Sequence, residues 1–349
     1  MKSPQLVTRT AIDSPLREFE QDYSCMTFQS HFGYPGPMAL KRAWRSILVA
    51  AVLGSVTVTT ATGSGADAPA AVSQTARRGS QIVLDPLKSY PDAYNTGPSG
   101  TLTVINHDVE LNQPGQSLRN AEVRGTVNIT SAATGAVLDN VRITWPSGRS
   151  PGGTGAMVVN RAANVSISNC EVNGGGQVLG GIFLVSGPVT VDRCNVSGAG
   201  DAIQAVNDVT VTNSYLHGMS TGPTHSWHVD TVQINVGRRG VYRHNTIINE
   251  FNQTAAFGLW AELGAVDDIL IEDNLIGGGG FTIYATKVGF PMTNVRFINN
   301  RFTSMIWARV GYWATDSPGY AGIVYPTGLP ADLVWSGNVY HETGLPVPL

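Results

Sequence analysis

The chain has 349 residues, of which 42% are hydrophobic and 13% charged, and its formal net charge is −3. The absence of a basic excess argues against a nucleic-acid-binding protein, and the apolar content argues against a chain that is disordered throughout. Length alone leaves one to three domains open.

The first 80 residues carry the features of a targeting segment. Lys41, Arg42 and Arg45 precede the apolar run 47–58, and small-x-small cleavage patterns follow at 66–70. We therefore predict a signal peptide over 38–68, a flexible mature N-terminus over 69–80, and secretion, with no membrane contact after cleavage. Residues 1–37 are interpreted as an upstream extension from a misassigned start. An N-terminal membrane anchor is the alternative.

A nine-residue pattern recurs from residue 164 onward. Its second, fourth and ninth residues are mostly apolar, which is the period-two signature of a half-buried strand. Residues 140–143 are interpreted as a partial earlier copy. The full copies begin at Asn164, Pro188, Asp208, Arg239, Asp268, Asn294 and Asp332. Short strands at such spacings, without helical segments between them, predict a coil in which each turn stacks on the one before.

The seventh position of the pattern predicts a column of stacked side chains. Stacked strands lie roughly 4.8 Å apart, so asparagines at one position can form an amide ladder. The first two members, Cys170 and Cys194, could form a disulfide, or they could be small buried thiols that fill the column. The column reads Cys170, Cys194, Ser214, Asn245, Asn274, Asn300 and Asn338.

The repeat resembles that of the right-handed parallel β-helix proteins of the pectin-lyase-like superfamily. The resemblance rests on units such as Asn-Val-Arg-Phe-Ile-Asn-Asn-Arg-Phe at 294–302, and it covers roughly residues 100–342. It implies an all-β, right-handed parallel β-helix over 81–349. The chain also resembles uncharacterised secreted bacterial β-helix proteins with a His-x-Asp-x-hydrophobic-Gln segment, here at 228–233. Members of the superfamily include lyases, glycoside hydrolases, epimerases and adhesins, so the fold does not settle the activity.

A second strand is predicted in each turn, and its outward side chains should form another column. Aromatic rings pack on sugars and amides bind hydroxyl groups, so this column is predicted to bind substrate. The alternative is a face covered by long loops. The predicted column contains Phe183, Gln204, Gln233, Trp260 and Tyr284, with Asn235 and Glu262 in the adjacent one.

Two aspartates begin the same four-residue motif in consecutive turns. Asp201 and Asp230 each precede a glutamine by three residues, so the two carboxyl groups should stack beside the outward column. A close carboxyl pair can perform acid and base steps on a glycosidic bond. Alternatively, both aspartates form turns. Glu262 is a third candidate acid.

The interval before Asp230 is long and contains several histidines. A loop over 216–227 is expected to project over the strand face, with His228 as a general acid or base, a substrate contact or a structural residue. His225, His228 and Asp230 do not form a strong zinc pattern, so no metal is predicted.

The function predicted most strongly is hydrolysis of an extracellular polysaccharide by acid/base chemistry. The first alternative is a lyase for an acidic glycan, with an arginine as the base and with Arg238 and Lys287 as substrate-binding residues. Calcium is the one cofactor that such a lyase could use. The second is a non-catalytic carbohydrate-binding or adhesion module. No other cofactor is expected, and the oligomeric state is left open. Residues 303–331 are predicted to form a cap or a lid, and residues 80–100 to close the opposite end.

Overall fold

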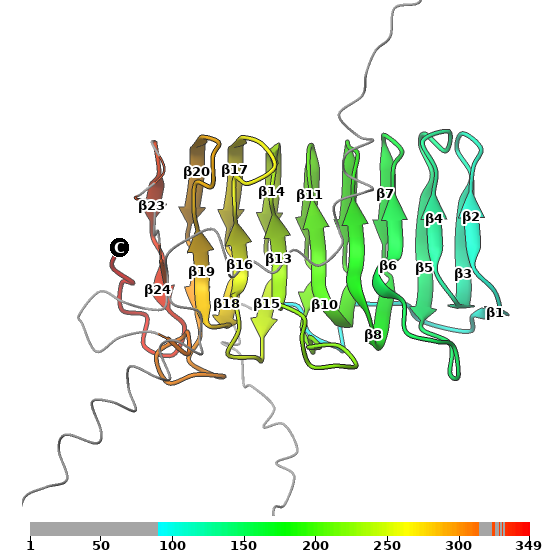
Figure 1. The fold of residues 1–349 in the computed structure, drawn as a ribbon, viewed down its shortest axis with the longest axis horizontal. Helices are drawn as coiled ribbons and strands as arrows, with labels where there is room; N and C mark the ends of the chain where they lie inside the picture. Colours follow the sequence, from blue (N-terminus) through cyan, green and yellow to red (C-terminus); the bar gives the residue numbers. More distant parts are fainter. Residues whose placement is uncertain (1–89, 314–322, 325–327, 329, 331) are drawn as a thin grey trace, which may run out of the picture. The chain divides into compact units, whose positions relative to one another are not determined.

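The computed structural model describes residues 90–313, 323–324, 328, 330 and 332–349. These residues lie in one compact unit, Val83–Leu349, and contain 24 strands in one continuous parallel arrangement. The predicted all-β solenoid is confirmed (Figure 1). No helix in this part of the chain is long and apolar enough to cross a membrane. The predicted signal peptide and flexible N-terminus lie outside the described residues.

Each turn of the solenoid contributes to three stacks of parallel strands. Stack 1 holds the first strand of the nine-residue repeat, and its members pair in register from one turn to the next. It contains β7 (Val165–Ser168), β9 (Val189–Asp192), β11 (Val209–Thr212), β14 (Gly237–Arg243), β17 (Val266–Glu272), β20 (Met292–Ile298) and β23 (Val334–Ser336).

Stack 2 holds the strands that, from β8 onward, begin directly after the seventh residue of each repeat copy. Its strands are β1 (Thr103–Ile105), β3 (Ser117–Arg124), β5 (Val137–Thr144), β8 (Glu171–Leu184), β10 (Asn195–Ala205), β12 (Tyr215–Leu216), β15 (Thr246–Asn249), β18 (Leu275–Gly278), β21 (Arg301–Phe302) and β24 (Val339–Tyr340). The first residues of β3 and β5 also continue stack 1, because both strands run through the corner between the two stacks.

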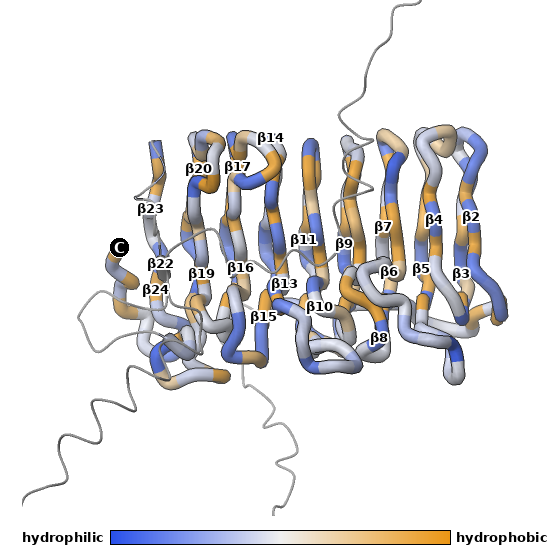
Figure 2. Tube along the Cα trace, in the orientation of Figure 1, coloured by the Kyte–Doolittle hydropathy of each residue, from blue (hydrophilic) through white to orange (hydrophobic). Residues whose placement is uncertain are grey.

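Stack 3 is the second strand predicted for each turn. It contains β2 (Val109–Leu111), β4 (Val127–Ile129), β6 (Gly153–Asn160), the last residues of β8 and β10, β13 (Asp230–Ile234), β16 (Ala255–Leu259), β19 (Phe281–Ala285) and β22 (Ile323–Val324). The inward residues of the three stacks form one apolar core along the coil. Figure 2 shows the resulting alternation of apolar and polar residues along the strands.

Left-handed residues form the corners of the coil at two fixed repeat positions. The sixth residue of all seven full copies has φ between 49° and 66°, and the first residue of six copies has φ between 51° and 58°. Pro188 is the exception, because its ring fixes a negative φ. Asparagine and aspartate tolerate this backbone region better than most residues, which explains why they recur at both positions.

The predicted asparagine ladder is confirmed. Asn245 donates its amide to the Asn274 side-chain oxygen at 3.0 Å, and Asn274 donates to Asn300 at 2.9 Å. Asn300 in turn donates to Asn338 at 3.0 Å, and every member is buried. Cys170 and Cys194 occupy the same column as buried free thiols, so the structure contains no disulfide between them.

The register corrects the interpretation of residues 140–143. The repeat pattern places Asn140 at the first position, but in the structure Val141 follows it into stack 2 and Leu138 pairs with Ile167. Asn140 therefore occupies the sixth position, with φ of 58°. The error arose because asparagine is favoured at both corners, so the residue type does not distinguish them.

The predicted N-terminal cap is also wrong for residues 90–100, which instead run along the corner between stacks 1 and 2. Tyr90 donates to Asp273 at 3.2 Å, Gly97 donates to the Arg193 carbonyl at 2.9 Å, and Ser99 donates to the Asn140 side chain at 2.7 Å. All three partners are sixth-position corner residues. We call residues 90–99 the N-terminal strap, because they cross several turns of the solenoid.

The predicted C-terminal cap or lid is described only in part. Residues 310–313 follow the end of stack 2, where Tyr312 and Trp313 donate backbone hydrogen bonds to the carbonyls of Gly279 and Gly280. Residues 314–322 lie outside the described part, so the choice between a cap and a lid stays a prediction.

Candidate functional site

The outward column of stack 3 brings together four of the five residues predicted for it. Phe183 pairs with Gln204, Gln204 with Gln233, and Gly258 with Tyr284 in the strand register. Gly258, not Trp260, is the residue paired with Gln233. The predicted alignment of Trp260 with Gln233, and with it that of Glu262 with Asn235, is therefore wrong, because β16 ends at Leu259 opposite Ile234.

The prediction for Trp260 is wrong because a shift of the strand by two residues preserves its alternation of inward and outward side chains. Phe257 and Leu259 are both apolar and both point inward, so either could pair with Val232. The short turn that places Ala255 opposite Asp230 decides the register, and its length is not encoded in the strand pattern.

The indole of Trp260 nevertheless reaches the column. A Cβ atom on Gly258 would lie 2.6 Å from the Trp260 indole nitrogen, so the ring covers the space above this glycine. The same ring lies 4.4 Å from the ring of Tyr284, measured between centroids. Trp260 is only 8% exposed, and its indole N–H has no acceptor in the described part of the chain. Glycine at position 258 therefore lets a later residue fill the column.

Asp201 and Asp230 stack as predicted. The backbone N–H of Asp230 donates to Asp201 Oδ1 at 3.0 Å, and Ala255 N–H donates to Asp230 Oδ1 at 2.9 Å. Gln204 donates to the second oxygen of Asp201 at 2.5 Å, and Gln233 to that of Asp230 at 3.3 Å. The two motifs thus repeat one hydrogen-bonded arrangement in consecutive turns.

The two carboxyl groups are closed off from solvent. Asp201 is 3% exposed and Asp230 is 1% exposed. Burial raises the pKa of Asp201 to about 7, and burial together with the neighbouring Asp201 raises the pKa of Asp230 well above its ordinary value. Neither carboxyl group forms an ion pair with a cation in the described part of the chain. Burial is therefore the largest cause of the rise in both pKa values.

His228 lies beside this pair but faces solvent. The backbone carbonyl oxygen of His228 lies close to Gly200, which directly precedes Asp201. Taken as a whole, His228 is exposed to solvent. Surrounding protein atoms still desolvate the imidazole and lower its pKa. The preceding loop returns along β10, where Ser220 donates to the Ala199 carbonyl at 2.8 Å. The loop therefore leaves the solenoid at the corner between stacks 2 and 3.

Of the remaining predicted residues, all but Arg238 lie around the end of stack 3. Asn235 donates to the Gln233 side chain at 3.3 Å, and the Glu262 backbone donates to the Asn235 carbonyl at 3.0 Å. Partial burial raises the pKa of Glu262. Lys287 follows β19 and is partly exposed, whereas Arg238 lies around the corner at the start of β14. Arg238 is thus separated from the column.

The described residues contain no group of three or more His, Cys, Asp or Glu that could hold a metal ion. His225 has another contact, because its Nδ1 lies 3.0 Å from the Thr221 hydroxyl.

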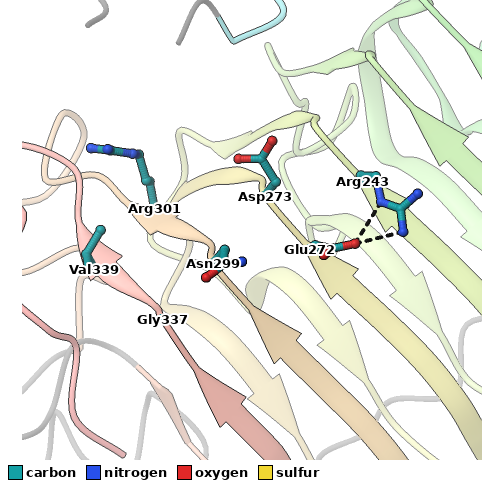
Figure 3. A pocket seen from close by; sticks show the side chains of 7 residues that line it. All are labelled: Arg243, Glu272, Asp273, Asn299, Arg301, Gly337 and Val339. Carbon is teal, nitrogen blue, oxygen red and sulfur yellow. Dashed lines mark hydrogen bonds and ion pairs between the residues drawn. The ribbon is translucent and has the colours of Figure 1, made fainter. Parts of the chain in front are cut away.

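A surface cavity of about 570 Å³ lies on the corner between stacks 1 and 2, which the sequence did not single out. Figure 3 shows Arg243 paired with Glu272 on one side of it and Arg301 on the other. Asp273, between them, accepts hydrogen bonds from Tyr90 and His244. The cavity thus continues the corner on which the N-terminal strap lies, and both Arg243 and Asp273 in its lining have polar partners.

Comparison with known proteins supports the architecture. Residues 96–265 match the family model described as the right handed beta helix region. No curated protein and no solved structure matches the chain. The matched segment spans the turns from the strap to β16 and includes both aspartates. Together, the stacked parallel strands and this match show that the chain folds as a right-handed parallel β-helix.

Proposed function

We propose that this protein is a secreted carbohydrate-binding β-helix protein whose ligand is an extracellular polysaccharide. The observation that carries the proposal is the outward column of stack 3, in which aromatic rings and side-chain amides succeed one another over five turns. Phe183, Gln233 and Tyr284 are each partly exposed there. Aromatic faces with neutral hydrogen-bonding groups are the usual chemistry of sugar recognition.

Binding fits the aspartate geometry better than cleavage does. A general acid or base must come within hydrogen-bond reach of the reacting atom. Asp201 and Asp230 are almost closed to solvent, and each carboxyl oxygen already accepts a hydrogen bond from a backbone N–H or a glutamine. In this arrangement the aspartates orient Gln204 and Gln233, and the amide of the partly exposed Gln233 is available to the ligand.

Migration of the full chain through native gels that contain a dissolved polysaccharide tests the proposal. We expect retardation by at least one polysaccharide and roughly tenfold weaker retardation for Gln233→Ala or Tyr284→Ala. Tyr94→Ala is the control, because Tyr94 is 85% exposed on the N-terminal strap, away from stack 3. Unretarded migration of the unmodified chain across neutral and acidic polysaccharides would refute the proposal.

Hydrolysis is a second candidate, favoured by one observation. The aspartates form a stacked pair with raised pKa values, and exposed His228 lies two residues before Asp230. Perturbed carboxyl pairs of this kind occur at catalytic sites as well as in structural networks. Release of reducing ends that disappears in Asp201→Asn and Asp230→Asn but persists in Tyr94→Ala would support it. Products that absorb in the ultraviolet would indicate a lyase instead.

A further inference from the structure

Six aromatic side chains form an unbroken series of ring contacts that begins on stack 3 and leaves it through residues 303–313. We call this series the aromatic strip. Its successive ring centroids are 4.4, 5.3, 5.1, 6.4 and 5.0 Å apart. In order, the strip contains Trp260, Tyr284, Phe281, Trp313, Tyr312 and Trp307.

Two of the three indole rings in the strip, those of Trp260 and Trp313, lie directly against the backbone of a glycine. The Trp260 ring covers Gly258, and the Trp313 ring lies so close to Gly280 that a Cβ there would come within 2.2 Å of it. Trp313 also donates its backbone N–H to the Gly280 carbonyl at 2.9 Å. Glycine beneath a ring lets one face rest on the backbone, which fixes the ring before any ligand arrives.

The outer members of the strip are open to solvent. Trp313 is 42% exposed and Tyr312 is 49% exposed, whereas the core aromatics Tyr242 and Phe257 are fully buried. Both exposed residues belong to the loop beside β18 and β19 that is drawn in orange in Figure 1. Large aromatic rings that are fixed and exposed together mark a recognition surface rather than core packing.

The polar groups next to the strip are mostly uncharged. Gln233 and Asn235 present amides, and the ionisable neighbours Glu262 and Lys287 carry opposite charges after consecutive stack 3 strands. Arg309 adds one cation in the loop. A polymer with an acidic group on every sugar would need cations at matching intervals, and the described part of the strip lacks such a row. Its chemistry instead suits a neutral sugar chain, whose apolar ring faces stack on aromatics.

We propose that the aromatic strip is the binding platform for a neutral polysaccharide, which passes from the stack 3 column over Tyr284 and Phe281 onto Trp313 and Tyr312. This proposal rests on the proposed function. It adds that the ligand is neutral and that the binding surface extends beyond the repeat into residues 303–313. The ligand spans the last turns of the solenoid, and its hydroxyl groups bind the amides of the column.

The test compares Trp313→Ala and Gly280→Ala in native gels that contain either hydroxyethyl cellulose, a neutral polymer, or polygalacturonate, an acidic one. Trp313→Ala removes the ring. Gly280→Ala keeps the ring but displaces it, because the new Cβ would clash with Trp313. The backbone of Gly280 is not in the left-handed region, so alanine adds no backbone strain there. Tyr94→Ala is again the control, and thermal unfolding monitored by circular dichroism verifies that each variant is folded.

We expect the full chain to be retarded by hydroxyethyl cellulose, with binding weakened roughly tenfold in Trp313→Ala and several-fold in Gly280→Ala. Unchanged binding in both variants, together with weaker binding in Gln233→Ala, would overturn the strip and leave the proposed function standing. Retardation by polygalacturonate alone would overturn the neutral ligand class. Retardation by neither polymer would overturn this inference, whereas the proposed function falls only if other polysaccharides also fail.

Discussion

Replacement of Asn274 by alanine should break the asparagine ladder near its centre. The Asn274 side chain accepts two hydrogen bonds from Asn245, one from its backbone N–H at 2.9 Å and one from its amide at 3.0 Å. It also donates to the Tyr242 carbonyl at 2.9 Å and to Asn300 at 2.9 Å. Asn274 is fully buried, so the partners left behind cannot turn to bulk water.

The magnitude follows from these four hydrogen bonds. Each intramolecular hydrogen bond contributes about 1 kcal/mol net, and each buried polar group that loses its partner costs about 1–3 kcal/mol. Two N–H donors of Asn245 lose their acceptor, while the Tyr242 carbonyl and the Asn300 side chain lose a donor. We therefore expect Asn274→Ala to lower the free energy of unfolding by about 3–5 kcal/mol.

Urea unfolding followed by circular dichroism measures this loss. Asn128→Ala is the matched control, because Asn128 makes side-chain hydrogen bonds at the partly exposed surface of β4. It should change the unfolding free energy by less than about 1 kcal/mol. A solenoid need not unfold in one step, so the midpoints of all transitions are compared. An Asn274→Ala variant as stable as Asn128→Ala would refute the ladder as a stabilising element.

Two further predictions concern buried polar groups. The Tyr242 hydroxyl is buried without a partner in the described part of the chain, so Tyr242→Phe should leave the free energy of unfolding unchanged or raise it by up to about 1 kcal/mol. If Tyr242→Phe instead lowers the free energy of unfolding by more than about 1 kcal/mol in the same urea assay, the hydroxyl has a hydrogen-bond partner. Burial raises the pKa of Asp201 from 3.8 to about 7, so its contribution to stability is present below about pH 4 and is lost as the pH rises through 7. Asp201→Asn should therefore gain stability relative to the unmodified chain between pH 5 and pH 8, and a difference that stays constant over this range would contradict the assignment.

The strand pattern predicted the stacks well because burial imposes it in every turn. Inward residues such as Ile203, Val232 and Ile283 had to be apolar, and the seventh position had to hold side chains that satisfy one another when stacked. The same logic brought Asp201 and Asp230 together, since identical motifs in consecutive turns occupy identical places.

Features that depend on turn length or on non-repeating contacts could not be predicted in this way. The position of Trp260 depends on the turn that precedes Ala255, and a shift of two residues leaves the inward and outward assignments unchanged. The N-terminal strap has no repeat of its own, and its path is visible only through contacts such as Tyr90 with Asp273. The sequence nevertheless contained a hint of where the Trp260 ring lies. Gly258 stands between Gln233 and Tyr284 in the strand register and has no side chain, which leaves space for a neighbouring ring.

The burial of the aspartates could not be inferred from the sequence either. Neighbouring glutamines could have held the carboxyl groups open to solvent or closed them off, and both arrangements satisfy the same spacing. In the structure each glutamine donates a hydrogen bond to its own aspartate, and in the proposed function this pair supports the column.

The crystal structure of the chain soaked with a neutral oligosaccharide tests the central claim most directly. Sugar rings over Tyr284 and Trp313, with hydroxyl groups bound to the amide of Gln233, are the expected result. Sugar bound instead in the corner cavity between Arg243 and Arg301 would contradict the assignment of stack 3 as the recognition face.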